Sequence, residues 1–143
     1  MAKLVDTSVS LCFYGDDLNP DALTQLLGIT PSRSGRKDEF VVRKTGNSHM
    51  VKTGYWRLQS EDSLSGDMDW QLTDLFGRMS DDLRVWRELS LSYNGEIFFG
   101  WFLTSSNDMA NISAQTIQHC AARGLSLSFD VYDFIEEHGE NSN

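Results

Sequence analysis

Residues Ser8–Tyr14, with the sequence SVSLCFY, alternate polar and apolar side chains and end in a polar break. Such alternation is typical of a β-strand that buries only one of its faces. A helix over 20–27 is predicted next, because Asn19 suits the N-cap and Pro20 suits the first helical position. Gly28 ends this helix, since glycine readily adopts the left-handed conformation found at helix ends. The chain therefore opens with a strand, a loop, a capped helix, a glycine and a further extended segment.

The same order of elements recurs near the end of the chain. Ile97–Leu103 is a continuous apolar run, and a polar loop follows it. Ser113 then predicts the start of a second helix and Gly124 its end, and residues 125–132 alternate like the first strand. Because Ile97–Leu103 is apolar on both faces, we expect a central strand that is covered on both sides or nearly so.

The segment between the two units is irregular at first and helical later. Residues 30–37 combine Pro, Gly, Ser and basic side chains, which is typical of a loop. The patterns that follow predict two short strands at 40–42 and 50–51, a strand at 55–59, a helix at 67–79 and a shorter helix at 80–89.

Together these elements predict an α+β fold, a two-layer sandwich in which helices cover one face of a mostly antiparallel sheet. The doubled strand–helix–strand unit indicates a ferredoxin-like pseudo-repeat, with the helices of residues 67–89 inserted between its halves. The chain has 143 residues, which is long enough for one core. We expect a single α+β domain over 1–134 and an acidic, flexible tail over 135–143.

The chain is acidic, with a net charge of −9 at pH 7. This charge opposes binding to nucleic acid and to anionic membranes, so we expect neither as a partner. No apolar segment approaches the ~20 residues of a membrane helix, and the first residues lack the apolar core of a signal peptide. Cys12 and Cys120 form neither a disulfide framework nor a C-x-x-C pair, which predicts free buried thiols. The cytoplasm is the expected location.

Three short motifs carry a resemblance to known sequences. They are Phe13-x-Gly15-Asp16-Asp17-Leu18-x-Pro20, Leu27-Gly28-Ile29-x-Pro31 and Gly54-x-Trp56-x-Leu58. On these motifs the chain resembles a family of small bacterial domains of unknown function, over nearly its whole length. The resemblance implies a compact single α+β domain with no established activity and no catalytic residues to transfer. Some members look like neighbours of bacterial toxin systems, which by analogy implies an immunity-like role.

Five of the twelve Lys and Arg residues lie within residues 33–44. A basic, irregular loop of this kind can hold a phosphate or carboxylate group through charge-assisted hydrogen bonds. The segment lacks the pattern of a P-loop, and the alternative is a solvated loop that pairs with the protein's own acidic surface. The ligand-binding residues predicted from this cluster are Arg33, Arg36 and Lys37, with Trp56 as a nearby wall.

A second candidate surface is the acidic segment 61–89, which carries eight acidic and three basic residues. Two tryptophans lie within it, and aromatic side chains surrounded by polar residues are typical of protein interfaces. The alternative is that both tryptophans pack in the core. The partner-binding residues predicted from this segment are Trp70, Asp74, Asp81, Asp82 and Trp86.

The sequence contains none of the familiar nucleophile, zinc-protease or dinucleotide motifs. We predict no catalytic residue, no metal site and no cofactor, and whether any reaction is catalysed stays open. The leading hypothesis is a non-catalytic interaction protein, immunity-like, that binds a basic protein through the acidic aromatic face. The alternative is a small anionic-ligand binder or enzyme that uses the basic loop 33–44. A homodimer formed through a sheet edge or the polar sheet face is compatible with either hypothesis.

Overall fold

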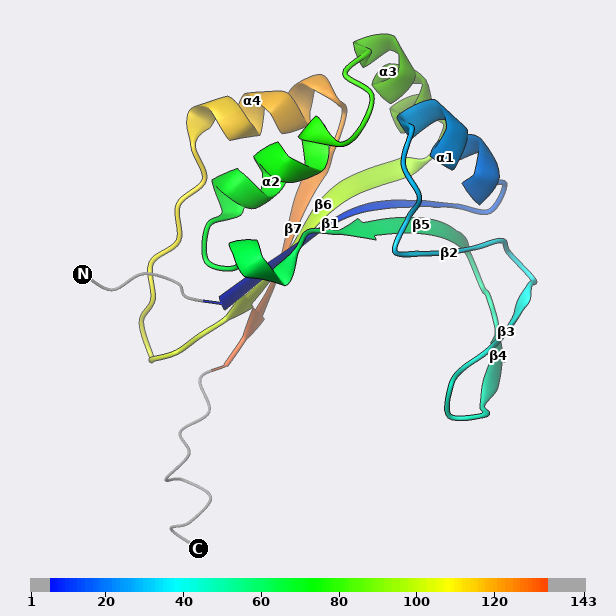
Figure 1. The fold of residues 1–143 in the computed structure, drawn as a ribbon, viewed down its shortest axis with the longest axis horizontal. Coiled ribbons are helices and arrows are strands. Elements are labelled where there is room, and N and C mark those ends of the chain that lie inside the picture. The colour runs from blue at the N-terminus through cyan, green and yellow to red at the C-terminus, as the bar shows by residue number, and fades with distance from the viewer. Residues whose placement is uncertain (1–5, 134–143) are drawn as a thin grey trace, which may run out of the picture.

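Four α-helices form one layer over a five-stranded sheet, and no helix of the described residues lies on the opposite face of the sheet (Figure 1). The computed structural model describes residues 6–133, so the tail predicted at 135–143 lies outside the described residues. The two-layer α+β fold is confirmed. Within residues 6–133, no helix has both the length and the apolar character that crossing a membrane requires.

The elements follow the predicted order with two additions, a short strand at 33–35 and a 3-10 helix at 62–64. The segment predicted as a loop at 30–37 contains a short edge strand, because its backbone pairs with the strand that follows. The elements are β1 (Asp6–Gly15), α1 (Pro20–Leu27), β2 (Arg33–Gly35), β3 (Phe40–Val42), β4 (Ser48–Met50), β5 (Gly54–Gln59), the 3-10 helix η1 (Asp62–Leu64), α2 (Met68–Gly77), α3 (Leu83–Ser92), β6 (Asn94–Phe102), α4 (Ala114–Ala122) and β7 (Ser126–Tyr132).

The strand order is β2-β5-β1-β6-β7, and β3 and β4 form a separate hairpin. β1 pairs antiparallel with β5 on one side and β6 on the other, β2 pairs antiparallel with β5, and β6 pairs parallel with β7. The sheet is therefore mostly antiparallel, as predicted. Because α1 connects β1 to β2 across β5, and α2 with α3 connects β5 to β6 across β1, these elements form two interlocked split units of the ferredoxin-like kind.

The prediction of which elements make up the repeat is wrong. The helices of residues 67–89 are the second crossover of the ferredoxin-like part and are not an insertion between its halves. The unit β6-α4-β7 adds a strand directly beside β6, whereas β1-α1-β2 leaves a strand between its two members. The two units therefore have the same order of elements along the chain, but their strands are arranged differently in the sheet.

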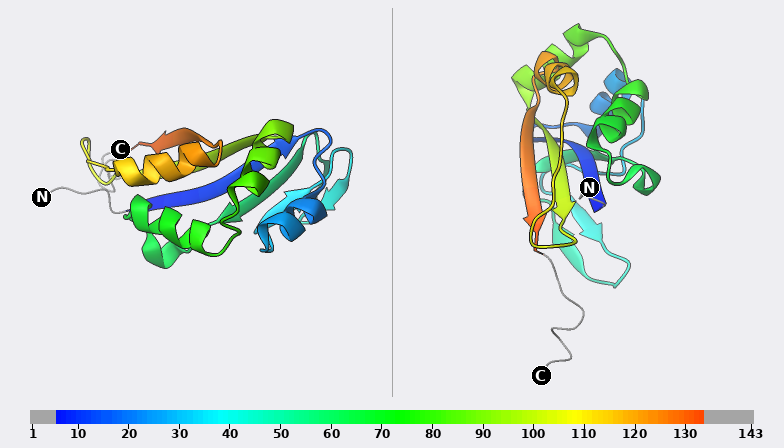
Figure 2. Two further views of the ribbon diagram at one scale, coloured as in Figure 1. Left: turned by 90° about the horizontal axis from the view of Figure 1, so that it is seen from above. Right: turned by 90° about the vertical axis from the view of Figure 1, so that its left-hand side faces the viewer.

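Figure 2 shows the helices stacked over one face of the sheet, and the buried side chains of the core come from these two layers. Phe13 of β1 is fully buried near its centre, with its ring centroid 6.4 Å from that of Trp56 and 6.3 Å from that of Trp86. Trp56 belongs to the neighbouring strand β5, and Trp86 belongs to helix α3. Phe13 therefore packs between the sheet and the helical layer. Burying large aromatic side chains in this way contributes strongly to stability.

The apolar run in β6 has a different cause from the one predicted. Helices cover only one of its faces, and Phe98 lies on the other. The guanidinium of Arg57 lies 5.5 Å from the centroid of the Phe98 ring, and Phe102 stacks on Tyr132 at 4.6 Å. Side chains of neighbouring strands thus cover these rings in part, which allows aromatic residues on an open sheet face.

A buried polar cluster ties the start of β1 to α2. The Thr7 hydroxyl donates to Gln71 Oε1 at 2.7 Å and accepts from the backbone N–H of Gly66 at 2.7 Å. Gln71 Nε2 donates in turn to the Thr7 carbonyl at 3.1 Å and to Ser60 Oγ at 3.2 Å. Each partner satisfies another, so the side chain of Gln71 is buried at little cost.

The Thr7→Val substitution tests this cluster. It keeps the shape of the side chain and removes the hydroxyl, so Gln71 Oε1 and the Gly66 N–H both lose their partner. We expect the free energy of unfolding, measured by urea denaturation, to fall by about 1–3 kcal/mol. The control is Thr73→Val, which removes a hydroxyl from an exposed position on α2. Equal small losses in both variants would contradict a structural role for the cluster.

Candidate functional site

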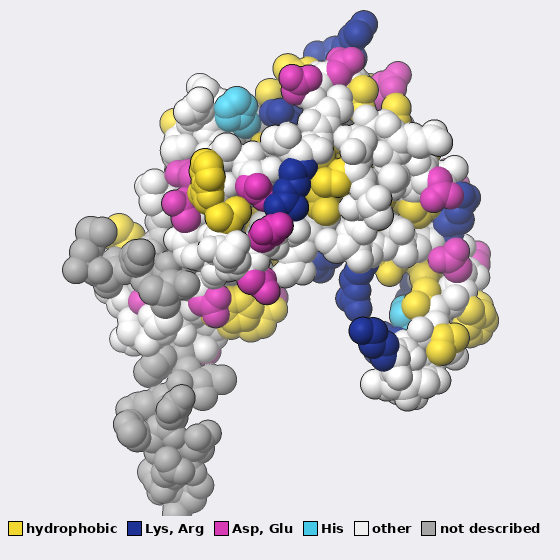
Figure 3. Space-filling view, viewed as in Figure 1, with side chains coloured by type: hydrophobic (Ala, Val, Ile, Leu, Met, Phe, Trp, Pro, Cys, Tyr) yellow, Lys and Arg dark blue, Asp and Glu magenta, His cyan; other side chains and the backbone are white. Residues whose placement is uncertain are grey.

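The open face of the sheet is hollowed on the side of the β3–β4 hairpin. The hairpin projects below the sheet, and Lys and Arg side chains line the space beside it (Figure 3). This hollow measures about 810 Å³. We call it the basic hollow; the residues that line it are Arg33, Ser34, Val41, Val42, Arg43, Lys44, His49 and Tyr55.

The charges of the basic hollow have one sign. Among the described residues, Arg33, Arg43 and Lys44 line it, and no Asp or Glu does. Within residues 6–133, none of these three cations forms an ion pair. Arg57 lies opposite Arg33 in the strand register, which places a further cation at the boundary of the hollow. A cluster of unpaired cations is stabilised by an anion that brings oxygen acceptors.

His49 contributes a polar atom without a partner. Its Nδ1 is buried and makes no hydrogen bond to any described residue. A buried ring nitrogen of histidine normally has a partner, because leaving it without one costs free energy. The ring of Tyr55 and the side chains of Val41 and Val42 add apolar surface to the same hollow. The accessible lining of the hollow thus offers charge and apolar walls.

Close packing at Gly35 holds the hairpin against the sheet. A Cβ atom on Gly35 would lie 2.9 Å from Tyr55 Cε1 and 3.2 Å from Val51 Cγ2. Val51 is buried, and its N–H donates to the Glu39 carbonyl at 2.8 Å while its carbonyl accepts from the Asp38 N–H at 2.7 Å. Gly35 therefore lets the Tyr55 ring and the base of the hairpin meet.

Of the four ligand-binding residues predicted from the sequence, only Arg33 lines the basic hollow. Arg36 Nη2 donates to Asn19 Oδ1 at 2.8 Å and lies 3.7 Å from Asp21 Oδ2, and Lys37 Nζ lies 3.3 Å from Asp16 Oδ2. These two cations pair with acidic residues around the start of α1. This is the alternative considered from the sequence, in which the loop pairs with the protein's own acidic surface.

Trp56 is not a wall of the hollow. Its side chain is fully buried on the covered face of the sheet, and its Nε1 donates to Thr24 Oγ1 at 3.1 Å. Its neighbour Tyr55 faces the hollow, because successive residues of a strand point to opposite faces. The aromatic side chain of β5 that lines the hollow is therefore Tyr55, whereas the sequence analysis named Trp56.

The acidic aromatic face predicted at 61–89 is largely used by the fold itself. Trp86 is fully buried, and its Nε1 donates to the Ser80 carbonyl at 2.7 Å. Asp82 caps α3 and pairs with Arg84 at 3.4 Å, and Asp74 pairs with Arg78 at 2.6 Å. Asp81 is exposed, and Trp70 is 55% exposed on α2. Trp70 and Asp81 therefore remain accessible, but the two tryptophans do not share one surface.

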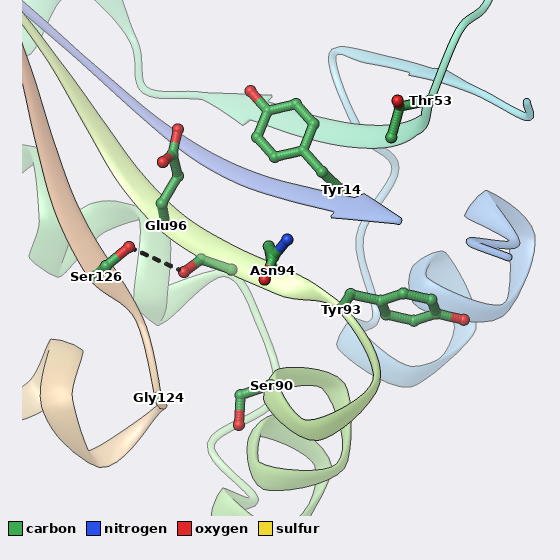
Figure 4. A pocket seen from close by; sticks show the side chains of 9 residues that line it. Tyr14, Thr53, Ser90, Tyr93, Asn94, Glu96, Gly124 and Ser126 are labelled. Atoms are coloured by element: carbon green, nitrogen blue, oxygen red, sulfur yellow. Dashed lines mark hydrogen bonds between the residues drawn. The ribbon is translucent and has the colours of Figure 1, made fainter. Parts of the chain in front are cut away.

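A second hollow, of about 720 Å³, adjoins the basic hollow at one end of the sheet. Tyr14 lines it and lies opposite Tyr55 in the strand register, so the two tyrosines mark the boundary between the hollows. Tyr14 and Glu96 project to the same side of the sheet, whereas Ser90 comes from α3 and Tyr93 points away from them (Figure 4). Burial, with a smaller effect from the nearby Cys12, raises the pKa of Tyr14 to about 12. These side chains do not converge on one point, which makes this hollow the weaker candidate.

Within residues 6–133, no three His, Cys, Asp or Glu side chains gather to form a metal-binding group. The two thiols are free and buried, as predicted. Burial raises the pKa of Cys12 above its usual range and that of Cys120 to about 11. Since the thiolate is the reactive form, neither group is suited to act as a nucleophile near neutral pH.

This predicts a low thiol reactivity in the native protein. At pH 8 we expect a disulfide reagent such as Ellman's reagent to modify both cysteines slowly in the folded protein and rapidly after unfolding in guanidinium chloride, because unfolding restores exposure and the ordinary pKa. The measurement is the absorbance change with time. A rapid reaction of one thiol in the folded protein would show that Cys12 or Cys120 is an accessible nucleophile.

The Gly35→Ala substitution tests how the basic hollow is built. The added methyl group meets the Tyr55 ring, so we expect shifted backbone NMR signals for residues 38–51 and a shifted Tyr55 ring. The matched control is Gly77→Ala in α2, where a Cβ has nothing within 4 Å and alanine favours the helix. If both variants leave the hairpin signals unchanged, Gly35 does not hold the hairpin in place.

The chain belongs to the DUF4279 family, a domain of unknown function, whose family model matches residues 5–134. This confirms the resemblance to a family without an assigned function. No curated protein and no solved structure matches the chain.

Proposed function

Because the family description assigns no activity, we propose from the geometry that this protein binds a small anionic ligand in the basic hollow. One observation carries the proposal: Arg33, Arg43 and Lys44 line one hollow without an ion pair among the described residues, in a protein of net charge −9. Arg36 and Lys37, from the same basic segment, pair with Asp21 and Asp16. The three cations of the basic hollow form no such pair, and they gather around one space.

The lining of the hollow defines the class of ligand. Arginine binds phosphate and carboxylate groups through paired hydrogen bonds, and lysine adds a compact charge. Tyr55, Val41 and Val42 supply apolar contact for the remainder of the ligand. We therefore favour a compound with a phosphate or carboxylate group attached to an apolar or aromatic part. The overall negative charge of the protein disfavours long polyanions such as nucleic acid.

The geometry supports this reading better than the binding of a basic protein through the segment 61–89. Binding of a basic protein is supported by Trp70 and Asp81, which are exposed. Trp86 is buried and does not contribute to such a surface. We also propose a bacterial, cytoplasmic protein. The two free cysteines support a reducing compartment, and the bacterial source rests on the sequence resemblance.

The test is a binding measurement with matched variants. Isothermal titration with inorganic phosphate, followed by aryl phosphates and aryl carboxylates, compares the native protein with Arg33→Gln and with Lys37→Gln. We expect Arg33→Gln to weaken binding at least about tenfold, because a hydrogen bond to a charged group contributes about 1.5–3 kcal/mol. Lys37→Gln removes an equal charge outside the hollow and should change affinity by less than about threefold, which corresponds to roughly 0.6 kcal/mol.

Two outcomes would contradict the proposal. Equal losses in the two variants would show that only net charge matters, and an absence of binding by every probe at millimolar concentration would show that the hollow does not take small anions.

A further inference from the structure

The two edges of the sheet differ in how they are protected. β2 forms one edge with only three residues, and short edge strands offer little backbone for pairing. β7 forms the other edge with seven residues, and in the described chain it pairs with β6 alone. A long strand with a free edge is a template for a further strand.

β7 also lacks the residues that usually block such pairing. Its sequence, Ser126–Tyr132, contains no Pro, Lys or Arg, and its one charged residue is Asp130. Phe129, Val131 and Tyr132 are 45%, 50% and 44% exposed. Phe129 and Val131 lie on the same face as Phe99 and Trp101, beyond the cover of α4, so the apolar surface of the sheet continues to its edge.

The direction of the backbone groups in β7 determines which residues can pair outward. The Tyr132 carbonyl accepts from the N–H of Leu103 at 3.1 Å, so Tyr132 turns its backbone groups toward β6. Successive residues of a strand alternate in this direction, so Leu127, Phe129 and Val131 turn theirs outward. These are also the residues whose side chains lie on the apolar face.

We propose that β7 pairs antiparallel with β7 of a second copy of this chain, about a twofold axis at Phe129. Phe129 then lies opposite its own counterpart, and Leu127 lies opposite Val131; all three have outward backbone groups, as hydrogen-bonded pairs require. A twofold axis perpendicular to the sheet makes two equivalent edges antiparallel, which is the commonest symmetry of homodimers.

Charge is compatible with this register. Asp130 lies opposite Ser128 of the second copy, so the only charged side chain of β7 meets a hydroxyl group rather than a like charge. The pairing also places Leu127 and Val131 side by side on the apolar face of the joined sheet. Aromatic and β-branched pairs across two strands stabilise a sheet. The edge is therefore complementary to itself, which is why we favour a second copy over a foreign strand.

Sedimentation equilibrium over a range of protein concentrations measures the association. We expect a concentration-dependent dimer whose dissociation constant rises at least tenfold in Val131→Lys, because a charged side chain then faces the apolar edge of the other copy. The matched control is Leu26→Lys, which places the same charge at an apolar residue of α1 that is 41% exposed, and α1 contacts β5 toward the opposite edge of the sheet. It should leave the dimer unchanged. A monomer at all concentrations overturns the proposal, and so does an equal effect of the two variants.

Cross-linking tests the register without disturbing the core. Ser128→Cys and Asp130→Cys place new thiols on the open face of β7, and the proposed register brings position 128 of one copy opposite position 130 of the other. Under mild oxidation we expect covalent dimers when the two variants are mixed and few when either is alone, because Cα atoms of opposed residues lie within disulfide range. Covalent dimers of either variant alone, or none in the mixture, would overturn the twofold axis at Phe129.

Discussion

The pairing of β1 with β5 on one side and with β6 on the other is the constraint on which the rest of the structure depends. This pairing places β5 between β1 and β2, and it places β1 between β5 and β6. The connection through α1 therefore passes over β5, and the connection through α2 and α3 passes over β1. Because all these connections run over the same face, the apolar side of β1 and Trp56 of β5 are buried there. No helix of residues 6–133 lies on the other face, and the hairpin that follows β2 projects beside that face (Figure 1). The pairing of β1 with β5 and β6 thus determines both the fold and the position of the basic hollow.

The open face of the sheet combines polar and aromatic side chains, and the strand register organises them in rows. One row runs from Arg33 through Arg57, Cys12 and Glu96 to Ser126, so positive charge lies toward the β2 edge and the carboxylate lies toward β7. Glu96 accepts a hydrogen bond from Ser128 at 3.0 Å and is held near that edge. The basic hollow is consequently not neutralised by the acidic residues of the same face. A ligand with a negative group would meet a field that changes sign across the sheet.

Local patterns predicted most of the elements, because alternation, caps and glycines act over a few residues. The alternation in Ser8–Tyr14 identified the faces of β1, and Asn19 and Ser113 cap α1 and α4 as expected. Strand order depends on contacts between distant segments, which local patterns do not reveal. The prediction therefore took the wrong two strand–helix–strand units as the halves of the pseudo-repeat. Two residues of the basic hollow, His49 and Tyr55, were missed for a related reason. The pairing of β3 with β4 places His49 opposite Val41, and the pairing of β2 with β5 places Tyr55 opposite Gly35, so both positions depend on which strands pair.

The central claim is that the unpaired cations of the open face form a binding site for an anion. Heteronuclear NMR of the arginine Nε–H groups and the tyrosine rings, during titration with inorganic phosphate at constant ionic strength, tests it most directly. We expect saturable shifts of Arg33, Arg43 and Tyr55 with one common dissociation constant, and unchanged signals for Arg36 and Arg84, which are paired with carboxylates. Shifts that are linear in phosphate, or that are equal for all exposed arginines, would contradict it.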